Sequence, residues 1–273
     1  MTAILALAKA EFRIAARNRW LAIAAVLMVV FALILTAAGS GPTGSLGVDR
    51  LSVTVASLTS LSVYLVPLIA LLLSFDAVAG EAERGTLSLI LTYPVGRGRI
   101  LAGKAAAHLA ILTLALLAGY GAAGAAAVLL DPASVAGLGA LWRLIWTSVA
   151  LGATFLGFGY AISARARRPS GAAGLAIGLW LLAVVLYDLA LLAAVVADNG
   201  GTFTKQVFPL TLLANPADAF RLYNLAASQA TAVAAGVAAA AQAVPVWQSA
   251  ASVLLWPLVS GGLALLSFKK VVP

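Results

Sequence analysis

Long apolar runs recur along this chain and constrain its fold more than any other feature. Several exceed about 18 residues, the length at which a helix crosses a hydrocarbon core about 30 Å thick. Charged residues make up 10% of the 273 residues and the mean hydropathy is +1.06, whereas a soluble domain is about 25% charged. In lipid only helices and closed barrels satisfy their backbone hydrogen bonds, and the alternating strands of a barrel are missing. The sequence therefore predicts an all-α polytopic membrane protein.

The apolar runs and the basic residues together predict the number of spans and their direction. Of the 17 lysines and arginines, all but Arg50, Arg143, Lys205 and Arg221 fall on one side of the predicted spans. Segments rich in Lys and Arg stay in the cytoplasm, so both termini are expected there, in a bacterial inner membrane. The basic residues are scattered between spans, which indicates topology signals and no nucleic-acid partner. The six predicted spans are Trp20–Ala38, Leu51–Phe75, Lys104–Leu130, Leu141–Ala164, Gly171–Ala197 and Val246–Phe268.

Segments outside the spans divide the chain further. Residues 1–19 place Lys9, Arg13 and Arg17 on one face of a helix, which predicts an N-terminal interfacial helix; a basic flank to the first span explains the pattern equally well. Residues 20–273 form the six-helix transmembrane domain. Within it, 76–103 is a cytoplasmic segment and 198–245 a periplasmic one. The alanine-rich run Ala226–Ala243 is interpreted as an external helix, because a seventh span would place the basic C-terminus outside.

Small residues recur within three of the predicted spans. In lipid, hydrophobicity does not drive helices together, and small residues allow the close approach that packing requires. Close helix packing is therefore expected in the third, fourth and fifth spans. The glycines concerned are Gly119, Gly121, Gly124, Gly152, Gly157, Gly159, Gly171, Gly174 and Gly178.

Residues able to carry out chemistry are few. His108 is the only histidine, Met28 is the only methionine apart from Met1, and cysteine is absent. Soft or imidazole ligands would be needed to move copper or zinc, so no metal site and no catalytic site is predicted. Residues Gly98–Ala105 nearly match a phosphate-binding loop, but Ala105 replaces the hydroxyl that holds magnesium, and no strand precedes the motif. We expect no nucleotide or other cofactor on this chain.

Asp188 lies inside the fifth predicted span, next to Tyr187. An ionisable group at that depth costs several kcal/mol unless it faces a cavity or a partner, which makes it a functional candidate. The alternative is a structural hydrogen bond to a residue of another span: Tyr64, Tyr120 or Thr154. An intramembrane enzyme that uses His108 and Asp188 together requires the two side chains to approach each other.

One polar bridge interrupts the apolar pattern, at residues 76–99. It carries acidic residues first and arginines afterwards, and it resembles the cytoplasmic coupling region of ABC-2 type transporter permeases. Matches elsewhere narrow the resemblance to the permeases of NosDFY complexes, which mature nitrous oxide reductase. The matching segments are Glu81–Leu87 (EAERGTL), Leu91–Arg99 (LTYPVGRGR), Gly103–Lys104, Arg17–Trp20 (RNRW), Ser74–Ala77 (SFDA), Leu186–Leu189 (LYDL) and Asn215–Leu222 (NPADAFRL).

The resemblance implies a non-catalytic permease that pairs with a second copy. A cytoplasmic ABC ATPase of the NosF type would bind ATP and Mg, and a periplasmic β-helical protein of the NosD type would sit outside. The implied role is to couple ATP hydrolysis to transport or rearrangement for copper-centre assembly in nitrous oxide reductase. An exporter of a lipid, drug or peptide is the alternative, and so is an intramembrane enzyme.

The resemblance also assigns candidate residues to two surfaces. A short helix near Glu81–Leu91 would dock on the ATPase, with charged residues as a rim and Leu87, Leu89 and Leu91 as anchors; a merely solvated loop is the alternative. The coupling candidates are Glu81, Glu83, Arg84, Gly85, Thr86, Leu87, Pro94, Arg97 and Arg99. The candidate contacts for the periplasmic partner are Lys205, Asn215, Asp218 and Arg221.

Overall fold

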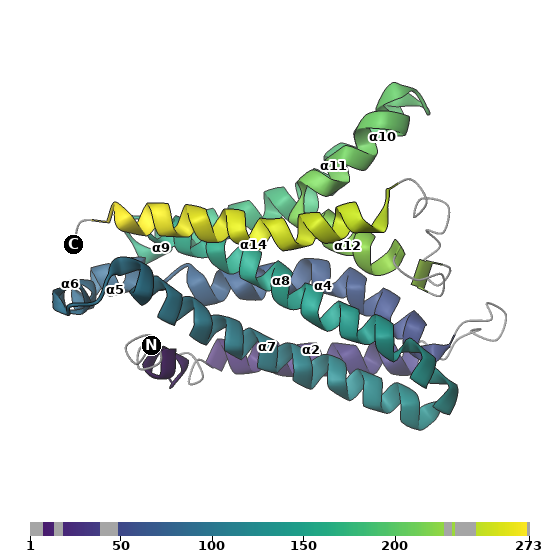
Figure 1. Ribbon diagram of the computed structural model, residues 1–273, viewed down its shortest axis with the longest axis horizontal. Coiled ribbons are helices and arrows are strands. Elements are labelled where there is room, and N and C mark those ends of the chain that lie inside the picture. The colour runs from purple at the N-terminus through teal and green to yellow at the C-terminus, as the bar shows by residue number, and fades with distance from the viewer. Residues whose placement is uncertain (1–7, 14–18, 39–48, 227–230, 233–243, 272–273) are drawn as a thin grey trace.

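The computed structural model describes residues 8–13, 19–38, 49–226, 231–232 and 244–271, and every regular element in these ranges is a helix (Figure 1). Six long helical segments coincide with the six predicted spans, which confirms the all-α polytopic fold. Five of them are long and apolar enough to cross a membrane, and the first contains a shorter apolar stretch, Val26–Ala37. The six segments are α2 (Arg19–Ala38), α4 (Arg50–Ser74), α7 (Arg97–Leu130), α8 (Leu138–Ser163), α9–η2–α10 (Pro169–Trp180, Leu181–Leu186 and Tyr187–Asp198) and α14 (Val246–Lys269).

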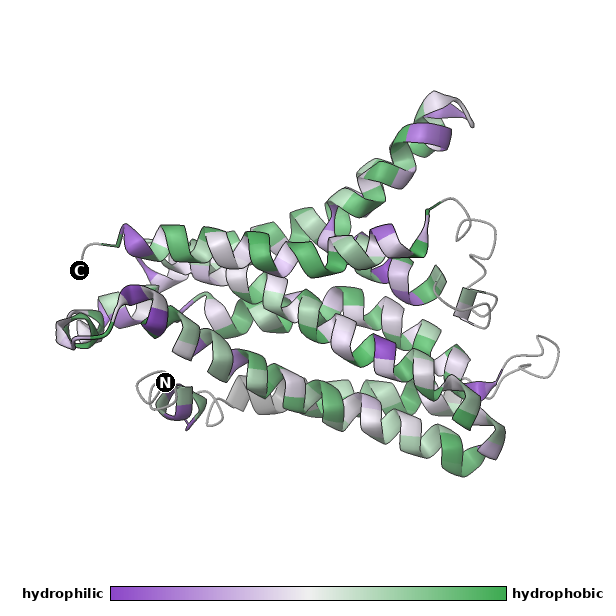
Figure 2. Ribbon diagram, in the orientation of Figure 1, coloured by the Kyte–Doolittle hydropathy of each residue, from purple (hydrophilic) through white to green (hydrophobic). Residues whose placement is uncertain are grey.

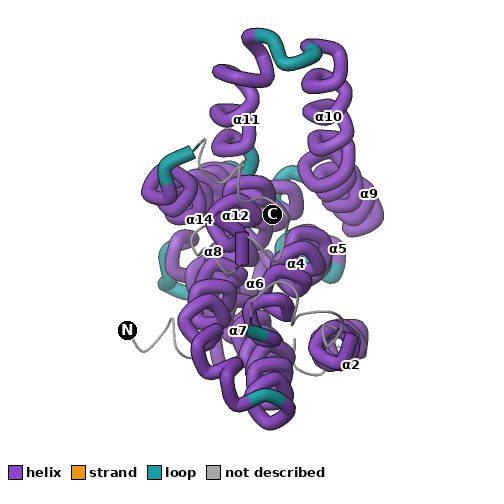
Figure 3. Tube along the Cα trace, turned by 90° about the vertical axis from the view of Figure 1, so that its right-hand side faces the viewer, coloured by secondary structure: helices purple, strands orange, loops and turns teal. Residues whose placement is uncertain are grey.

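Helix α8 is the centre of the bundle. It packs against α4 on one side and α14 on another, and large side chains such as Phe155 and Tyr160 are fully buried there. Helix α2 packs on α7 and α4 at one edge, and α9 packs on α4 and α8. Figure 3, which looks along the bundle, shows α2 at one edge and α9 to α11 at another. Figure 2 shows that the long helices are mostly hydrophobic, with hydrophilic turns at the end that carries α5.

Glycines in the fourth span permit the close packing that the sequence predicts. A methyl group on Gly157 would lie 2.8 Å from the backbone carbonyl carbon of Ser260 in α14. A methyl group on Gly159 would lie 1.9 Å from the hydroxyl oxygen of Ser74 in α4. Helix α8 therefore approaches both neighbours at distances that a larger residue would not allow.

The glycines of the fifth span behave differently. Among the residues that the structure describes, nothing lies within 4 Å of a methyl group placed on Gly171, Gly174 or Gly178. Only 6% of the apolar window of Pro169–Asp198 is buried within the chain, against 50–61% for α4, α7 and α8 with their extensions. Helix α9 does pack on α4 and α8, but within the described part of the chain these three glycines are not where the helices approach closely.

The polar bridge forms two short helices, α5 (Ala79–Glu83) and α6 (Thr86–Thr92), where the sequence predicts one helix near Glu81–Leu91. The break falls at Gly85, whose φ of 71° is in the left-handed region that glycine adopts without strain. Helix α7 begins at Arg97, seven residues before the predicted span, so its first two turns extend beyond the apolar run.

The opposite end of the bundle carries four further elements: η1 (Pro132–Gly137), η3 (Phe203–Val207), α11 (Phe208–Ala214) and α12 (Pro216–Ala226). Helices α10 and α11 are joined through η3 and project away from the bundle (Figure 1). Helix α12 returns and packs against α4, α8 and α14. Most of the predicted external helix Ala226–Ala243, and most of the predicted N-terminal interfacial helix, lie outside the described residues.

Candidate functional site

The start of helix α5 is fixed to the end of α8 by hydrogen bonds from backbone amides to a serine side chain. The amides of Val78 and Ala79 both donate to the hydroxyl oxygen of Ser163, each at 3.0 Å. Gly80 allows the chain to turn tightly here, because a methyl group on it would lie 2.1 Å from a carboxylate oxygen of Asp76. The start of α5 therefore has one fixed position against the bundle.

A buried charge cluster, which we call the Lys104 cluster, joins α5 to three other elements. Lys104 Nζ lies 2.6 Å from Glu81 Oε1 in α5 and 3.0 Å from Glu11 Oε1 in helical residues 8–13. Glu11 also lies 3.8 Å from His108 Nε2, one turn further along α7. His108 Nδ1 and the Tyr160 hydroxyl of α8 are hydrogen-bonded at 2.6 Å. The cluster thus comprises Glu11, Glu81, Lys104, His108 and Tyr160.

The burial of Lys104 makes this cluster a rigid connection. Its side chain is 3% exposed and that of Glu81 is 12% exposed. A buried ammonium is stable only with close anionic partners, so α5 cannot move from α7 without breaking these contacts or taking α7 with it. The near-match to a phosphate-binding loop does not form such a loop, because Gly98 to Ala105 lie within one α-helix. Its lysine, Lys104, is paired with the carboxylates of Glu11 and Glu81.

Beyond this cluster, α5 and α6 expose a mixed surface, which we call the α5–α6 surface. It carries Glu83, Arg84, Leu89 and Tyr93; Leu89 is 64% and Tyr93 68% exposed. Arg84 makes only an exposed contact, 3.5 Å from Asp76. Large exposed apolar side chains among charges are typical of a surface that another protein covers.

The coupling candidates from the sequence separate into outward and inward groups. Glu83, Arg84, Pro94 and Arg99 are exposed, whereas Glu81 points into the Lys104 cluster and Leu87 is buried, so these two are not the rim and anchor expected of them. Gly85 forms the turn, and Thr86 donates to the Glu81 carbonyl at 3.2 Å. Arg97 donates to the Lys269 carbonyl at 2.5 Å, which joins the start of α7 to the end of α14.

Sequence reasoning missed Glu11, Lys104, Tyr160 and Ser163. None of these residues stands out in the sequence. Lys104 fits a positive-inside flank of the third span, and Glu11 fits an N-terminal interfacial helix. The sequence predicts Lys104 as the first residue of the third span, so it gives no sign that Lys104 lies seven residues inside α7.

A second cluster joins the fifth span to α12. Asp188 Oδ2 accepts from Arg221 Nη2 at 2.8 Å, and Arg221 Nη1 lies 3.3 Å from Asp218 Oδ1. Asp188 is therefore paired with Arg221, and the alternative of a structural bond to Tyr64, Tyr120 or Thr154 is not the contact that the structure shows. Tyr120 instead bonds to Ser62, and Thr154 donates to the Ala150 carbonyl.

Asp218 lies at the buried end of this second cluster, in α12 and outside the predicted spans. Its side chain is 2% exposed. Burial, with the neighbouring Asp188 carboxylate, raises the pKa of Asp218 to about 8. The nearby Arg221 guanidinium acts in the opposite direction and lowers the pKa of Asp218, but it does not outweigh the burial.

Asn215 makes the connection between α12 and the fifth span. Its Nδ2 donates to the Ala183 carbonyl at 2.7 Å, inside the π-helical turn η2, and its Oδ1 accepts from the Ala217 amide at 2.8 Å. Such π turns misalign the helix ladder and often mark functional positions. Tyr187 donates to the Thr211 carbonyl at 2.8 Å, so it too holds the α10–α11 pair.

The predicted periplasmic contacts are mostly internal. Asn215 and Asp218 are buried and Arg221 is committed to two carboxylates, whereas Lys205, in η3, is exposed. His108 and Asp188 belong to separate clusters that share no residue, so the structure does not assemble the pair that an intramembrane enzyme would need.

The fold and these clusters define a class: a multi-pass helical membrane protein whose buried charges connect helices, with a short-helix surface at one end. The chain belongs to the ABC-2 family of transporter proteins, whose family model matches residues 5–271. It is 43% identical over 267 residues to a probable ABC transporter permease protein NosY of Pseudomonas aeruginosa, covering 97% of this chain and 96% of that protein. A protein of the same name from Stutzerimonas stutzeri is 43% identical over 242 residues, covering 88% and 87%. The chain is thus an ABC transporter permease subunit similar to NosY.

Proposed function

We propose that this permease transmits the work of a separate ABC ATPase to the far side of the membrane, in support of copper-centre assembly in nitrous oxide reductase. The observation that carries the proposal is the α5–α6 surface, which is exposed and yet fixed to the bundle through the Lys104 cluster. The likeness to proteins named NosY supplies the reductase context.

The α5–α6 surface suits a groove on an ATPase. Leu89 and Tyr93 supply apolar anchors, and Glu83 with Arg84 supplies charges that select the partner and its orientation. The ATPase would carry the ATP and Mg, and this chain would bind neither.

Transmission would follow the contacts already described. A push on α5 is passed to α7 through Glu81 and Lys104, and to α8 through Ser163. Helix α8 contacts α12, which is tied to the fifth span through Arg221 and Asn215. A movement at the α5–α6 surface can thereby reach α10 and α11 as a rigid-body shift of packed helices.

The external side and the second copy complete the proposed assembly. We expect both termini and the α5–α6 surface in the cytoplasm, and Lys205 outside, where it is available to a periplasmic β-helical protein. A second copy of this chain would cover the exposed fifth span.

The cargo is constrained by the side chains available. One histidine, one methionine besides Met1 and no cysteine offer few soft ligands, which favours mechanical transmission or passage of a non-copper solute such as a sulfur species.

The test is affinity purification from native membranes, followed by an ATPase assay on the recovered complex. We expect an ABC ATPase and a periplasmic repeat protein to co-purify, and ATP hydrolysis to require both permease and ATPase. The double variant Glu83→Lys with Arg84→Glu should lose the ATPase, whereas Lys205→Glu, at the far end, should keep it. Normal assembly and activity in the double variant would refute the α5–α6 surface as the docking site. An ATPase recovered without a periplasmic protein would favour an exporter of another cargo.

A further inference from the structure

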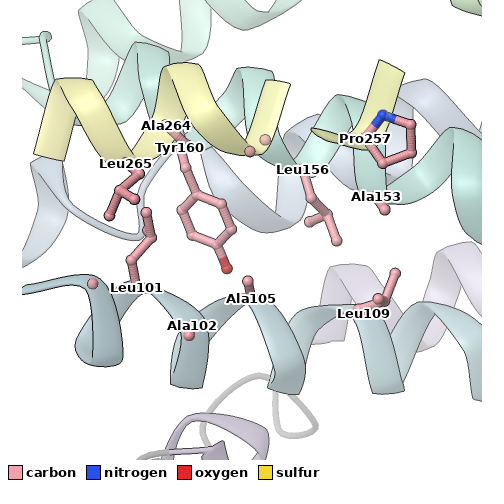
Figure 4. A pocket seen from close by; sticks show the side chains of 13 residues that line it. Leu101, Ala102, Ala105, Leu109, Ala153, Leu156, Tyr160, Pro257, Ala264 and Leu265 are labelled. Carbon is pink, nitrogen blue, oxygen red and sulfur yellow. The ribbon is translucent and has the colours of Figure 1, made fainter. Parts of the chain in front are cut away.

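A groove of about 310 Å³ lies between α7, α8 and α14 (Figure 4). Its lining includes Gly98 at the start of α7 and Tyr160 near the end of α8, which places it in the half of the bundle that carries α5. Helix α7 contributes Leu101 and Leu109, α8 contributes Leu156 and Tyr160, and α14 contributes Leu265. Figure 4 shows α14 along one side, α7 along the other, and the Tyr160 ring between them. The volume is at the small end of ligand pockets, which run from about 300 to 1,000 Å³.

The walls of the groove offer nothing to a polar ligand. Apart from Tyr160, every lining residue is apolar or a glycine. The Tyr160 hydroxyl is already bonded to His108. The occupant must therefore be a hydrocarbon or another apolar surface, since a polar group would lose its hydrogen bonds with water and gain none.

The mouth of the groove has the opposite character. Gly98 and Leu265 line the groove near its α5 end. Arg97 and Arg99 flank Gly98 at the start of α7, and Lys269 and Lys270 follow Leu265 by four and five residues at the end of α14. The 2.5 Å hydrogen bond from Arg97 to the Lys269 carbonyl brings these two helix ends together. Neither helix contains an acidic residue anywhere along its length.

We propose that this groove binds one anionic phospholipid, with an acyl chain between α7, α8 and α14 and the phosphate headgroup on the basic mouth. An apolar slot that ends in clustered arginine and lysine at a helix terminus has the chemistry of an anionic lipid. A neutral lipid would fill the slot and leave the positive charges without partners. A helix of a second copy would have to bring acidic residues of its own to pair with these four positive charges.

Two adjacent glycines of α14 allow a sharp test of the acyl-chain part. Gly261 lines the groove and Gly262 does not, and a methyl group on either meets nothing within 4 Å. The full-length chain is purified in mild detergent, stripped of lipid, and titrated with phosphatidylglycerol or phosphatidylcholine under native mass spectrometry. We expect Gly261→Leu to lower phosphatidylglycerol occupancy about tenfold and Gly262→Leu to leave it unchanged.

The headgroup part is tested with exposed charges that folding does not need. Arg99→Gln with Lys270→Gln should weaken phosphatidylglycerol binding by about tenfold and abolish its preference over phosphatidylcholine. Arg167→Gln with Arg168→Gln removes the same charge between α8 and α9, and should change neither. Equal binding of both lipids to the wild-type chain would overturn the proposal. So would a Gly261→Leu protein that keeps its lipid but no longer self-associates, because the groove would then be an interface between copies.

Discussion

Replacing Lys104 tests whether buried charge holds the docking helix to the bundle. Lys104→Met removes the ammonium while keeping an unbranched side chain in the same space. Glu81 then loses the ion pair that it makes in the described structure. Its second oxygen, Oε2, is buried and has no hydrogen-bond partner there, so it offers no replacement contact. Among its contacts with described residues, Glu11 keeps the 3.8 Å contact with His108.

The size of the effect follows from burial. Removing one member of a buried ion pair costs about 3–5 kcal/mol, because the remaining charge is left unpaired. Glu81 and Glu11 are 12% and 17% exposed, so some water reaches them and we expect the lower end, about 3 kcal/mol. The exposed pair Arg84–Asp76, with side chains 59% and 42% exposed, should by contrast contribute less than about 1 kcal/mol.

The assay is unfolding of the purified full-length chain by dodecyl sulfate in mixed micelles. Four proteins form a double-mutant cycle: wild type, Lys104→Met, Glu81→Gln, and the double variant. Because Gln carries no charge that could be left unpaired, the double variant should recover part of the stability that Lys104→Met loses. We expect a coupling energy of about 1–3 kcal/mol between the two positions. Arg84→Met, an exposed change, is the matched control.

Two results would refute this reasoning. A loss below about 1 kcal/mol for Lys104→Met would mean that water solvates the cluster as it does a surface pair. Strictly additive single effects would mean that Lys104 and Glu81 do not interact energetically. If the cluster also transmits motion, Lys104→Met should retain the ATPase and lose the effect of ATP on the far end of the bundle.

Three further outcomes are expected from unfolding measurements on the same protein. The folded-state pKa of Asp218, about 8, exceeds the ordinary 3.8, so the contribution of Asp218 to stability should fall as pH rises from 3.8 to about 8. The variant Asp218→Asn should flatten this pH dependence of the free energy of unfolding. An unchanged pH profile in the variant would exclude Asp218 as its source. Gly157→Ala should lower stability by about 1–3 kcal/mol, because the added methyl group would lie 2.8 Å from the backbone carbonyl carbon of Ser260. Gly139→Ala should cost little, because its methyl group meets nothing within 4 Å. Equal effects of the two variants would contradict the close packing of α8 on α14. Asn215→Ala removes the hydrogen bond to η2 and the one that caps α12, and should lower stability by about 1–2 kcal/mol. An unchanged stability would show that water replaces both hydrogen bonds.

The spans were predictable because the membrane imposes a length on the sequence. A helix that crosses lipid needs about 20 apolar residues, and all six predicted runs coincide with helices. The break at Gly85 was not predicted, because glycine in a polar segment fits a helix interior, a turn or a loop equally well. The early start of α7 was missed for a related reason, since beyond the membrane surface a helix has no hydrophobic limit.

The partners of the buried charges were beyond sequence reasoning. The sequence marks Asp188 as costly, yet Arg221 lies 33 residues away in α12, an 11-residue helix within the segment that the sequence assigns to the periplasm. Lys104 and Glu11 are 93 residues apart. Pairing at such separations depends on which helices are neighbours, and one chain's periodicity gives the buried face of a helix but not the identity of what covers it.

The glycines give a second example in which the sequence does not identify the neighbour of a helix. Glycines recur both in α8 and in the fifth span, and the sequence predicts close packing for both. Helix α8 finds α4 and α14 within its own chain, whereas Gly171, Gly174 and Gly178 face no described neighbour. Small residues on a lipid-facing helix gain nothing from lipid itself, because their benefit is the close approach of another helix. We therefore expect a second polypeptide to cover the fifth span, and a second copy of this chain would present the same face.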